Sequence, residues 1–98
     1  MSRYNSEVRT PEIEFKGKKV FRFTASWCQP CKMLAKMLDE TTTDVLIDVI
    51  DIDTNDELPK QFGIRGVPAL VMMNEGKEVK RLVGLPQNQK ELANWFNT

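Results

Sequence analysis

Two cysteines, Cys28 and Cys31, are separated by two residues in this 98-residue chain, and they are its only cysteines. A pair at this spacing can close a disulfide with little movement of the backbone, so it can cycle between a dithiol and a disulfide. The thiolate is the nucleophile in thiol–disulfide exchange. The chemistry therefore depends on a neighbouring group that lowers the pKa of one of the two thiols.

The chain contains no histidine. Its absence removes the usual general base of cysteine and serine hydrolases and also the commonest metal ligand. A structural zinc site takes about four ligands, typically cysteine and histidine, so two thiols do not complete one within a single chain. We expect neither a metal nor a cofactor, although a zinc ion shared between two chains remains an alternative.

Composition and charge favour a soluble domain that binds neither nucleic acid nor membrane. Apolar residues make up 41% of the chain and charged residues 29%, which suits a packed core and not a disordered chain. The 14 basic and 14 acidic residues cancel, so no overall field attracts polyanions. No stretch has the pattern of a signal peptide or a membrane span. We expect a single domain over residues 1–98, a monomer, in the cytoplasm.

The segment before the cysteines is predicted to be a strand and the segment after them a helix. Lys19–Ala25 is rich in β-branched and aromatic residues and follows a glycine breaker. Apolar residues three and four positions apart predict a helix through Glu40, with Pro30 in its first turn. A second strand, Val45–Ile52, completes a βαβ unit, and its largely apolar composition predicts burial on both faces.

Further segments extend this unit to an α/β domain, a mixed sheet with helices on both faces. Near the N-terminus, Thr10 is placed to cap a short helix, although Val8–Phe15 fits an extended segment equally well. The other expected elements are a short helix capped by Thr54 or Asn55 and closed by Gly63, a β-hairpin of Val67–Met73 and Lys77–Val83, and a helix opened by Pro86 with an apolar stripe of Leu92, Trp95 and Phe96.

The predicted helix begins at the two cysteines, which gives them different roles. The positive end of a helix and its free backbone N–H groups stabilise negative charge on the first sulfur and lower its pKa. Cys28 lies outside the first turn, so we expect it to attack a substrate disulfide and form a mixed disulfide. Cys31 faces inward and is expected to release the product as the resolving thiol.

The residues around the cysteines resemble the active-site signature of thioredoxins. Residues 27–32 read W-C-Q-P-C-K, against W-C-G-P-C-K in that family, and residues 62–68 read F-G-I-R-G-V-P, against Y-G-I-R-G-I-P. Val83 and Gly84 match the segment before the last helix of the family. The resemblance runs from about Val20 to Phe96, and its two separate motifs occur in the expected order.

The resemblance implies a thioredoxin fold, in which a central mixed sheet of four to five strands is flanked by helices, here with the first strand and helix shortened. It also implies a cis peptide bond before Pro68, and a backbone N–H and C=O of Val67 that bind an extended substrate by β-augmentation. Ordinary core packing is the alternative for two of the implied residues, Trp27 and Ile64. The residues implied to support the cysteines or to form an apolar surface for partner proteins are Trp27, Gln29, Pro30, Ile64, Gly66, Val67, Pro68 and Gly84.

Three positions depart from the thioredoxin pattern. Arg22 stands where the family usually carries a buried aspartate, Val49 where it commonly has a lysine, and Gln29 where it has glycine. Asp51 lies on the same face of its strand as Val49 and is placed to pair with Arg22. A guanidinium beneath the thiols would lower the cysteine pKa and give a more oxidising couple, with water or Asp51 as the base. In the alternative, Arg22 extends to the surface beside a sheet edge.

Three functions fit these residues, and the first is the one we expect. It is a thiol–disulfide oxidoreductase that reduces protein disulfides, and the resemblance implies substrates such as ribonucleotide reductase or peroxidases and an NADPH-dependent thioredoxin reductase as its reductant. The second is a glutaredoxin-like protein reduced by glutathione, which the motifs disfavour because glutaredoxins more often have a C-P-Y-C motif. The third is a binding subunit that uses the apolar surface of the fold without redox chemistry.

Overall fold

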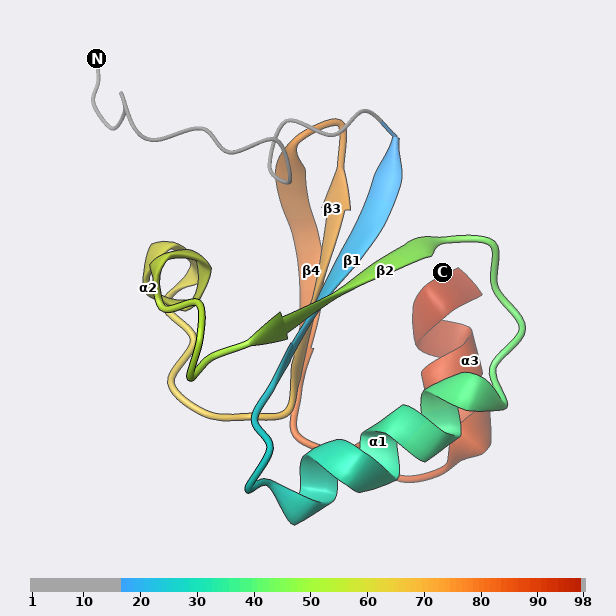
Figure 1. The fold of residues 1–98 in the computed structure, drawn as a ribbon. Coiled ribbons are helices and arrows are strands. Elements are labelled where there is room, and N and C mark those ends of the chain that lie inside the picture. The colour runs from blue at the N-terminus through green and yellow to red at the C-terminus, as the bar shows by residue number, and fades with distance from the viewer. Residues whose placement is uncertain (1–16, 98) are drawn as a thin grey trace.

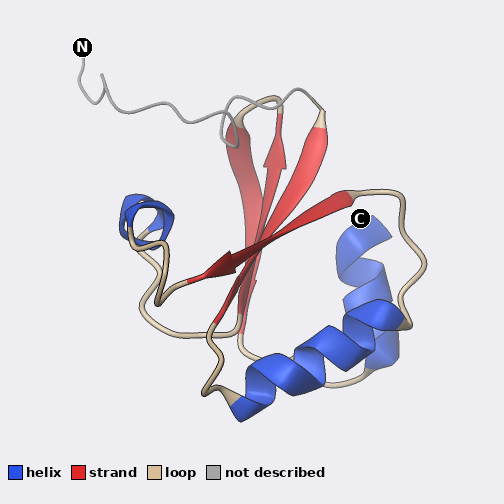
Figure 2. Ribbon diagram, viewed as in Figure 1, coloured by secondary structure: helices blue, strands red, loops and turns tan. Residues whose placement is uncertain are grey.

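The computed structural model describes residues 17–97, which form four strands and three helices (Figure 2). This order confirms the predicted succession of elements. The helix or extended segment predicted near Thr10, and the shortened first strand and helix, lie outside the described residues. The elements are β1 (Lys18–Thr24), α1 (Gln29–Asp39), β2 (Leu46–Asp51), α2 (Glu57–Phe62), β3 (Ala69–Asn74), β4 (Lys77–Val83) and α3 (Gln89–Asn97).

The four strands form one mixed sheet in the order β2-β1-β3-β4. β1 runs parallel to β2 and antiparallel to β3, and β3 runs antiparallel to β4. A tight turn joins β3 to β4, where Glu75 and Gly76 have positive φ values of 54° and 81°, as a two-residue type I′ hairpin requires. The predicted parallel unit and the predicted hairpin are therefore confirmed.

Helices cover both faces of the sheet, with α1 and α3 on one face and α2 on the other (Figure 1). Side chains alternate along β1, so Phe21 and Phe23 point to the α2 face, whereas Val20 points to the α1 face. An apolar cluster lies on each side. The buried members are Phe21, Phe23, Ile50, Leu58, Ala69, Val71 and Met73 on the α2 side, and Val20, Leu34, Leu70, Met72, Leu92 and Phe96 on the α1 side.

β2 is an edge strand of this sheet, and the prediction that both of its faces are buried was wrong. Leu46 and Val49 are each 55% exposed. Leu46 lies beside Lys19 on the α2 face and Val49 beside Arg22 on the α1 face, so each face of β2 is partly open. An apolar composition makes a strand suited to burial. Whether the strand is buried depends on how much of the sheet the helices cover, and the composition of the strand does not determine this.

α3 begins later than predicted. Pro86 is buried but lies in the preceding loop, and the helix starts at Gln89. Asn88 caps the helix, because its Oδ1 accepts the backbone N–H of Glu91 at 2.8 Å. The side-chain cap, and not the proline, thus sets the start.

The apolar stripe predicted for α3 is confirmed. Leu92 and Phe96 are buried against the sheet, and Trp95 packs partly buried at the edge of the same cluster. The ring of Trp95 meets that of Phe96 edge-on, with the ring centroids 5.2 Å apart. None of the helices within residues 17–97 is long and apolar enough to cross a membrane.

Candidate active site

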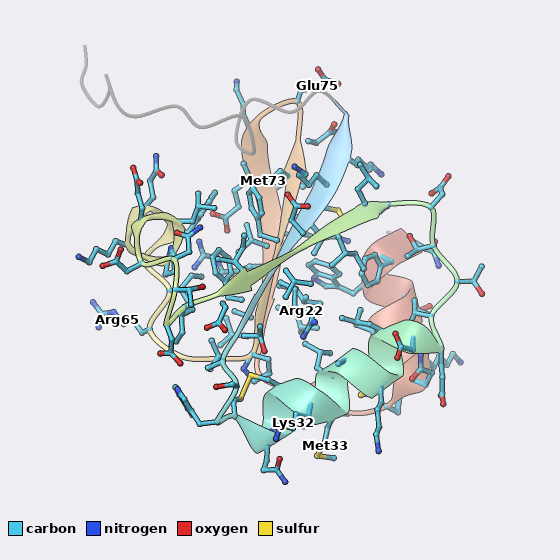
Figure 3. The ribbon with its side chains drawn as sticks, viewed as in Figure 1. Arg22, Lys32, Met33, Arg65, Met73 and Glu75 are labelled. Atoms are coloured by element: carbon cyan, nitrogen blue, oxygen red, sulfur yellow. A yellow bond between two sulfur atoms is a disulfide. The ribbon has the colours of Figure 1, made fainter. Side chains whose placement is uncertain are left out.

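Cys28 and Cys31 are joined in a disulfide at the start of α1, where Figure 3 draws the sulfur–sulfur bond in yellow. Their Cα atoms are 5.2 Å apart, within the usual range for a disulfide. Both residues are nearly buried, with 4% of Cys28 and 1% of Cys31 exposed, and they pack with Ala25. The predicted pair therefore closes, and the little solvent access that remains is greater at Cys28.

The N-terminus of α1 is built around the sulfur of Cys28. Cys28 is the N-cap residue and has an extended backbone, with φ −96° and ψ 108°. Its Sγ accepts the backbone N–H of Cys31 at 3.1 Å. Pro30 falls in the first turn, where no intrahelical donor is needed, and it is exposed together with Gln29. The N–H group and the positive end of the helix both favour negative charge on this sulfur.

The loop between α2 and β3 lies against the disulfide. The Val67–Pro68 peptide bond is cis, which confirms the expectation for Pro68. Val67 packs against the cluster of Cys28 and Cys31. The Gly84 N–H donates to the Pro68 carbonyl oxygen at 2.9 Å, so the end of β4 is tied to this loop. The Pro68 loop, distant in sequence from the cysteines, thus lies at the disulfide, and Gly84 is hydrogen-bonded to that loop.

Trp27 lies at the surface next to the disulfide, with 65% of its area exposed. Core packing, the alternative for this residue, is therefore wrong. Its Nε1 donates a hydrogen bond to Asp53 Oδ2 at 3.0 Å, and the Asp53 N–H donates to Asp51 Oδ1 at 2.9 Å. Gly66 is also exposed, whereas Ile64 is half-buried against the α2-side cluster.

Asp53 is a residue of this site that was not predicted from the sequence. It follows the end of β2, and Trp27 follows the end of β1. Because β1 and β2 are parallel, their carboxyl ends lie at the same edge of the sheet, where loop residues of α/β proteins meet. Because the two strands were predicted to be parallel, polar residues after the second strand could have been predicted to lie near the cysteines, which follow the first strand.

Arg22 projects from β1 toward α1, between the sheet and the helix (Figure 3), and is half-buried. Two cavities adjoin it. The first, of about 250 Å³, is lined among others by Arg22, Thr24, Ser26, Cys31, Lys32 and Asp51, and we call it the thiol-side cavity. The second, of about 220 Å³, is lined among others by Arg22, Leu38, Asp39 and Val49. Arg22 therefore shares a cavity with the buried cysteine.

The expected ion pair between Arg22 and Asp51 was wrong. Both residues line the thiol-side cavity, but no ion pair joins them within residues 17–97. Burial is the main cause that lowers the pKa of the Arg22 guanidinium, and the carboxylate of Asp39 on α1 acts in the opposite direction. Placing Arg22 and Asp51 on the same face of the sheet did not identify Asp39 as the carboxylate that acts on Arg22. A long side chain such as that of Arg22 also extends toward the helix packed over its face.

A metal site is not formed by the described residues. Within residues 17–97, no group of three or more His, Cys, Asp or Glu side chains is arranged to hold a metal ion. The two sulfurs are bonded to each other, so neither is a thiolate ligand in this state.

Comparison with known proteins gives one consistent result. A family model described as Thioredoxin matches residues 2–98. The thioredoxin of Haemophilus influenzae is 42% identical over 80 residues, which covers 76% of this chain and 73% of the relative. The thioredoxin of Chlamydia caviae is 39% identical over 85 residues, which covers 84% of this chain and 78% of the relative.

Other matches span less of the relative or concern the fold. The thioredoxin of Mycobacterium bovis is 41% identical over 66 residues, 63% of this chain, and the match spans only 57% of that relative's length. Among solved structures, a mutant thioredoxin from Halobacterium salinarum superposes with a TM-score of 0.75 at 34% identity, covering 84% of this chain and 74% of the other. The mixed sheet flanked by three helices therefore matches a thioredoxin-fold structure.

Proposed function

This chain belongs to the thioredoxin family, and we propose that it reduces protein disulfides by thiol–disulfide exchange at its two cysteines. The observation that carries the proposal is the Cys28–Cys31 disulfide at the N-terminus of α1, with the Cys31 N–H directed at Cys28 Sγ. A reversible disulfide and a stabilised first sulfur are the two requirements of this chemistry.

The proposed reaction has two steps and transfers two electrons to the substrate. The Cys28 thiolate attacks one sulfur of a substrate disulfide, the substrate S–S bond breaks, and the leaving sulfur takes up a proton. Cys31 then loses its proton and attacks Cys28 Sγ in the mixed disulfide, so the second substrate sulfur leaves and is protonated. The substrate ends as two thiols, and the protein ends as the Cys28–Cys31 disulfide.

We propose that a protein substrate binds in an extended conformation across the loop that contains Pro68. Val67 would pair with it through its backbone N–H and C=O, and contact of Val67 with the cysteine cluster supports this position. The exposed indole of Trp27, the residue before Cys28, supports a further apolar contact with the substrate. The other residues proposed to line this surface are Gln29, Pro30, Ile64, Gly66 and Gly84.

We also propose that Arg22 tunes the couple. Its side chain lines the thiol-side cavity together with Cys31, and a positive charge beside a thiol favours the thiolate. Stabilising the thiolate stabilises the reduced protein, which makes the couple more oxidising. Asp39 attenuates this charge because it is the carboxylate that acts on Arg22. Asp51, in the same cavity, is the second residue proposed to influence the thiols.

The proposed partners follow from the family and not from any contact of this chain. They are protein disulfides, for example those of ribonucleotide reductase, and an NADPH-dependent thioredoxin reductase that returns the protein to the dithiol form. Disulfide reduction needs a reducing compartment, so we propose that the protein acts in the cytoplasm, as a monomer.

Insulin reduction tests the proposed function. With a thioredoxin reductase and NADPH, the wild-type protein is expected to precipitate insulin chains, whereas Cys28→Ser is expected to be inactive because it lacks the nucleophile. Cys31→Ser is expected to accumulate the mixed disulfide with the substrate. Failure of the wild-type protein to reduce insulin, with the reductase or with glutathione, would contradict the proposal and favour a binding subunit. Activity with glutathione but not with the reductase would favour the glutaredoxin-like alternative.

A further inference from the structure

The second step of the proposed exchange requires a proton acceptor near Cys31. A thiol attacks a disulfide only as the thiolate, so Cys31 has to lose its proton before it attacks Cys28 Sγ. Only 1% of Cys31 is exposed, so contact with bulk solvent is nearly absent. Whatever accepts this proton therefore lies in the space that adjoins the buried sulfur.

The thiol-side cavity is that space, since Cys31 is one of its lining residues. Its ionisable lining residues come from three elements. Arg22 projects from β1, Lys32 from α1, and Asp51 ends β2. Arg22 and Lys32 carry cationic groups that donate hydrogen bonds and accept none. The hydroxyls of the remaining polar lining residues, Thr24 and Ser26, are far weaker bases than a carboxylate.

We infer that Asp51 is the acceptor of the Cys31 proton, an inference that rests on the exchange reaction proposed above. As Cys31 attacks, its S–H bond breaks and its proton passes to the Asp51 carboxylate, directly or through water. The Cys31 sulfur then forms the bond to Cys28 Sγ, and the substrate sulfur leaves with the electron pair of the broken bond. Protonated Asp51 returns the proton to solvent, and the departing thiolate takes one up.

The surroundings of Asp51 fit this role. Its Oδ1 accepts the Asp53 N–H at 2.9 Å, which holds the carboxylate in place while its second oxygen offers lone pairs for a proton. A cavity of about 250 Å³ with polar lining groups has room for water between the thiol and the carboxylate. Arg22 and Lys32 place positive charge in the same cavity, where it stabilises the thiolate that is left behind.

The two steps can be separated in one experiment with an aromatic disulfide that releases coloured thionitrobenzoate. Mixing it with reduced protein in a stopped-flow instrument gives a first release when Cys28 attacks. A second release follows when Cys31 resolves the mixed disulfide. We would compare wild-type protein with Asp51→Asn, in which an amide oxygen still accepts the Asp53 N–H but takes up no proton. Asp56→Asn, at an exposed residue outside the cavity, removes the same charge as the matched control.

In Asp51→Asn the second release is expected to slow by at least about tenfold at neutral pH, because general base catalysis is lost. The first release should change by much less than the second, because Cys28 is not a lining residue of the cavity, and Asp56→Asn should match wild type in both. Asp51→Glu, which keeps a carboxylate, should recover part of the rate. The second-release rate of Asp51→Asn should rise steeply with pH, since the thiol then ionises without help, whereas that of wild type should vary less.

Two outcomes would overturn this inference, and they differ. If the second release is equally fast in Asp51→Asn and wild type, Asp51 is not the acceptor although the exchange reaction stands. If wild-type protein gives no second release, the exchange reaction itself fails and the role of Asp51 fails with it. The wild-type pH profile is an independent check that needs no variant: a tenfold rise per pH unit throughout the range below the thiol pKa would show that the thiol ionises without a carboxylate acceptor.

Discussion

The two faces of the sheet differ sharply at residues 21–23 of β1. Phe21 and Phe23 point to the α2 face, where their rings and that of Phe62 lie 5.7 to 6.2 Å apart by centroid. Arg22, between them in sequence, points to the α1 face and borders two cavities. The alternation of side chains along one strand thus separates a dense aromatic core from an open, charged space next to the disulfide.

The α1 face is not polar along its whole length. Farther from the disulfide, Val20 and Leu34 are fully buried in an apolar cluster with residues of α3. The polar section is confined to the part of the face between Arg22 and Cys31. Both sides of the sheet therefore contain a packed apolar cluster, and only a short section of the α1 side has ionisable groups in place of apolar packing.

Truncation in the aromatic core should have the largest effect. Phe23→Ala is expected to lower the free energy of unfolding by about 3–5 kcal/mol, because it removes a fully buried ring and leaves a cavity. Urea denaturation of the oxidised protein, followed by circular dichroism, measures this change. A loss below about 1 kcal/mol would contradict the description of the α2 face as a densely packed core.

Removing the charge on the other face should act on the chemistry more than on the fold. Arg22→Ala is expected to raise the pKa of the Cys28 thiol, because a positive charge in the cavity beside the cysteine pair is lost, and to make the couple more reducing. The pH dependence of alkylation by iodoacetamide and the equilibrium with glutathione measure both quantities. Lys36→Ala, at an exposed lysine of α1, is the control. Equal behaviour of the two variants would refute an effect specific to Arg22.

The loop that ends α2 should make a smaller contribution to stability. Gly63 has φ 65° and closes the helix in the left-handed conformation, and a Cβ there would meet no atom within 4 Å. Gly63→Ala is therefore expected to cost about 1 kcal/mol from the backbone alone. Gly66→Ala, where φ is not positive and space is also open, should cost less in the same urea titration. The reverse order would show that side-chain contacts, and not φ, decide the cost.

Replacing Arg22 by an apolar residue of similar length should have the smallest effect on stability. Burial disfavours the charged guanidinium and lowers its pKa, so Arg22→Met is expected to raise the free energy of unfolding, by less than about 1 kcal/mol. The same denaturation series provides the measurement. A clear destabilisation would mean that Arg22 is a structural residue, contrary to its proposed role beside the thiols.

The part of the site formed by consecutive residues was predictable, because its signals are local. A proline in the first turn and apolar residues at helical spacing placed Cys28 at the helix N-terminus, where it caps α1. The contribution of the Pro68 loop was predicted only from the family resemblance, since no local sequence pattern places residue 68 beside residue 28. The mixed sheet with helices on both faces followed from the order of the elements.

Contacts between elements were predicted less well. The burial of β2 and the pairing of Arg22 were wrong, and the hydrogen bond from Trp27 to Asp53 was not predicted. Each of these depends on how far a helix covers a strand or on where a long side chain points, and both are set by packing across the whole sheet. The start of α3 was misplaced for a simpler reason, because Asn88 offers a better cap than the proline before it.

The capping of α1 by Cys28 Sγ couples helix formation to electron transfer. Reduction would convert the capping atom from a weak neutral acceptor into an anion, and charge-assisted hydrogen bonds are roughly twice as strong as neutral ones. The hydrogen bond that caps the first turn of α1 is therefore stronger in the thiolate than in the disulfide. By thermodynamic linkage, anything that frays this turn also disfavours the thiolate, so the conformational stability of one helical turn and the reduction potential of the protein vary together.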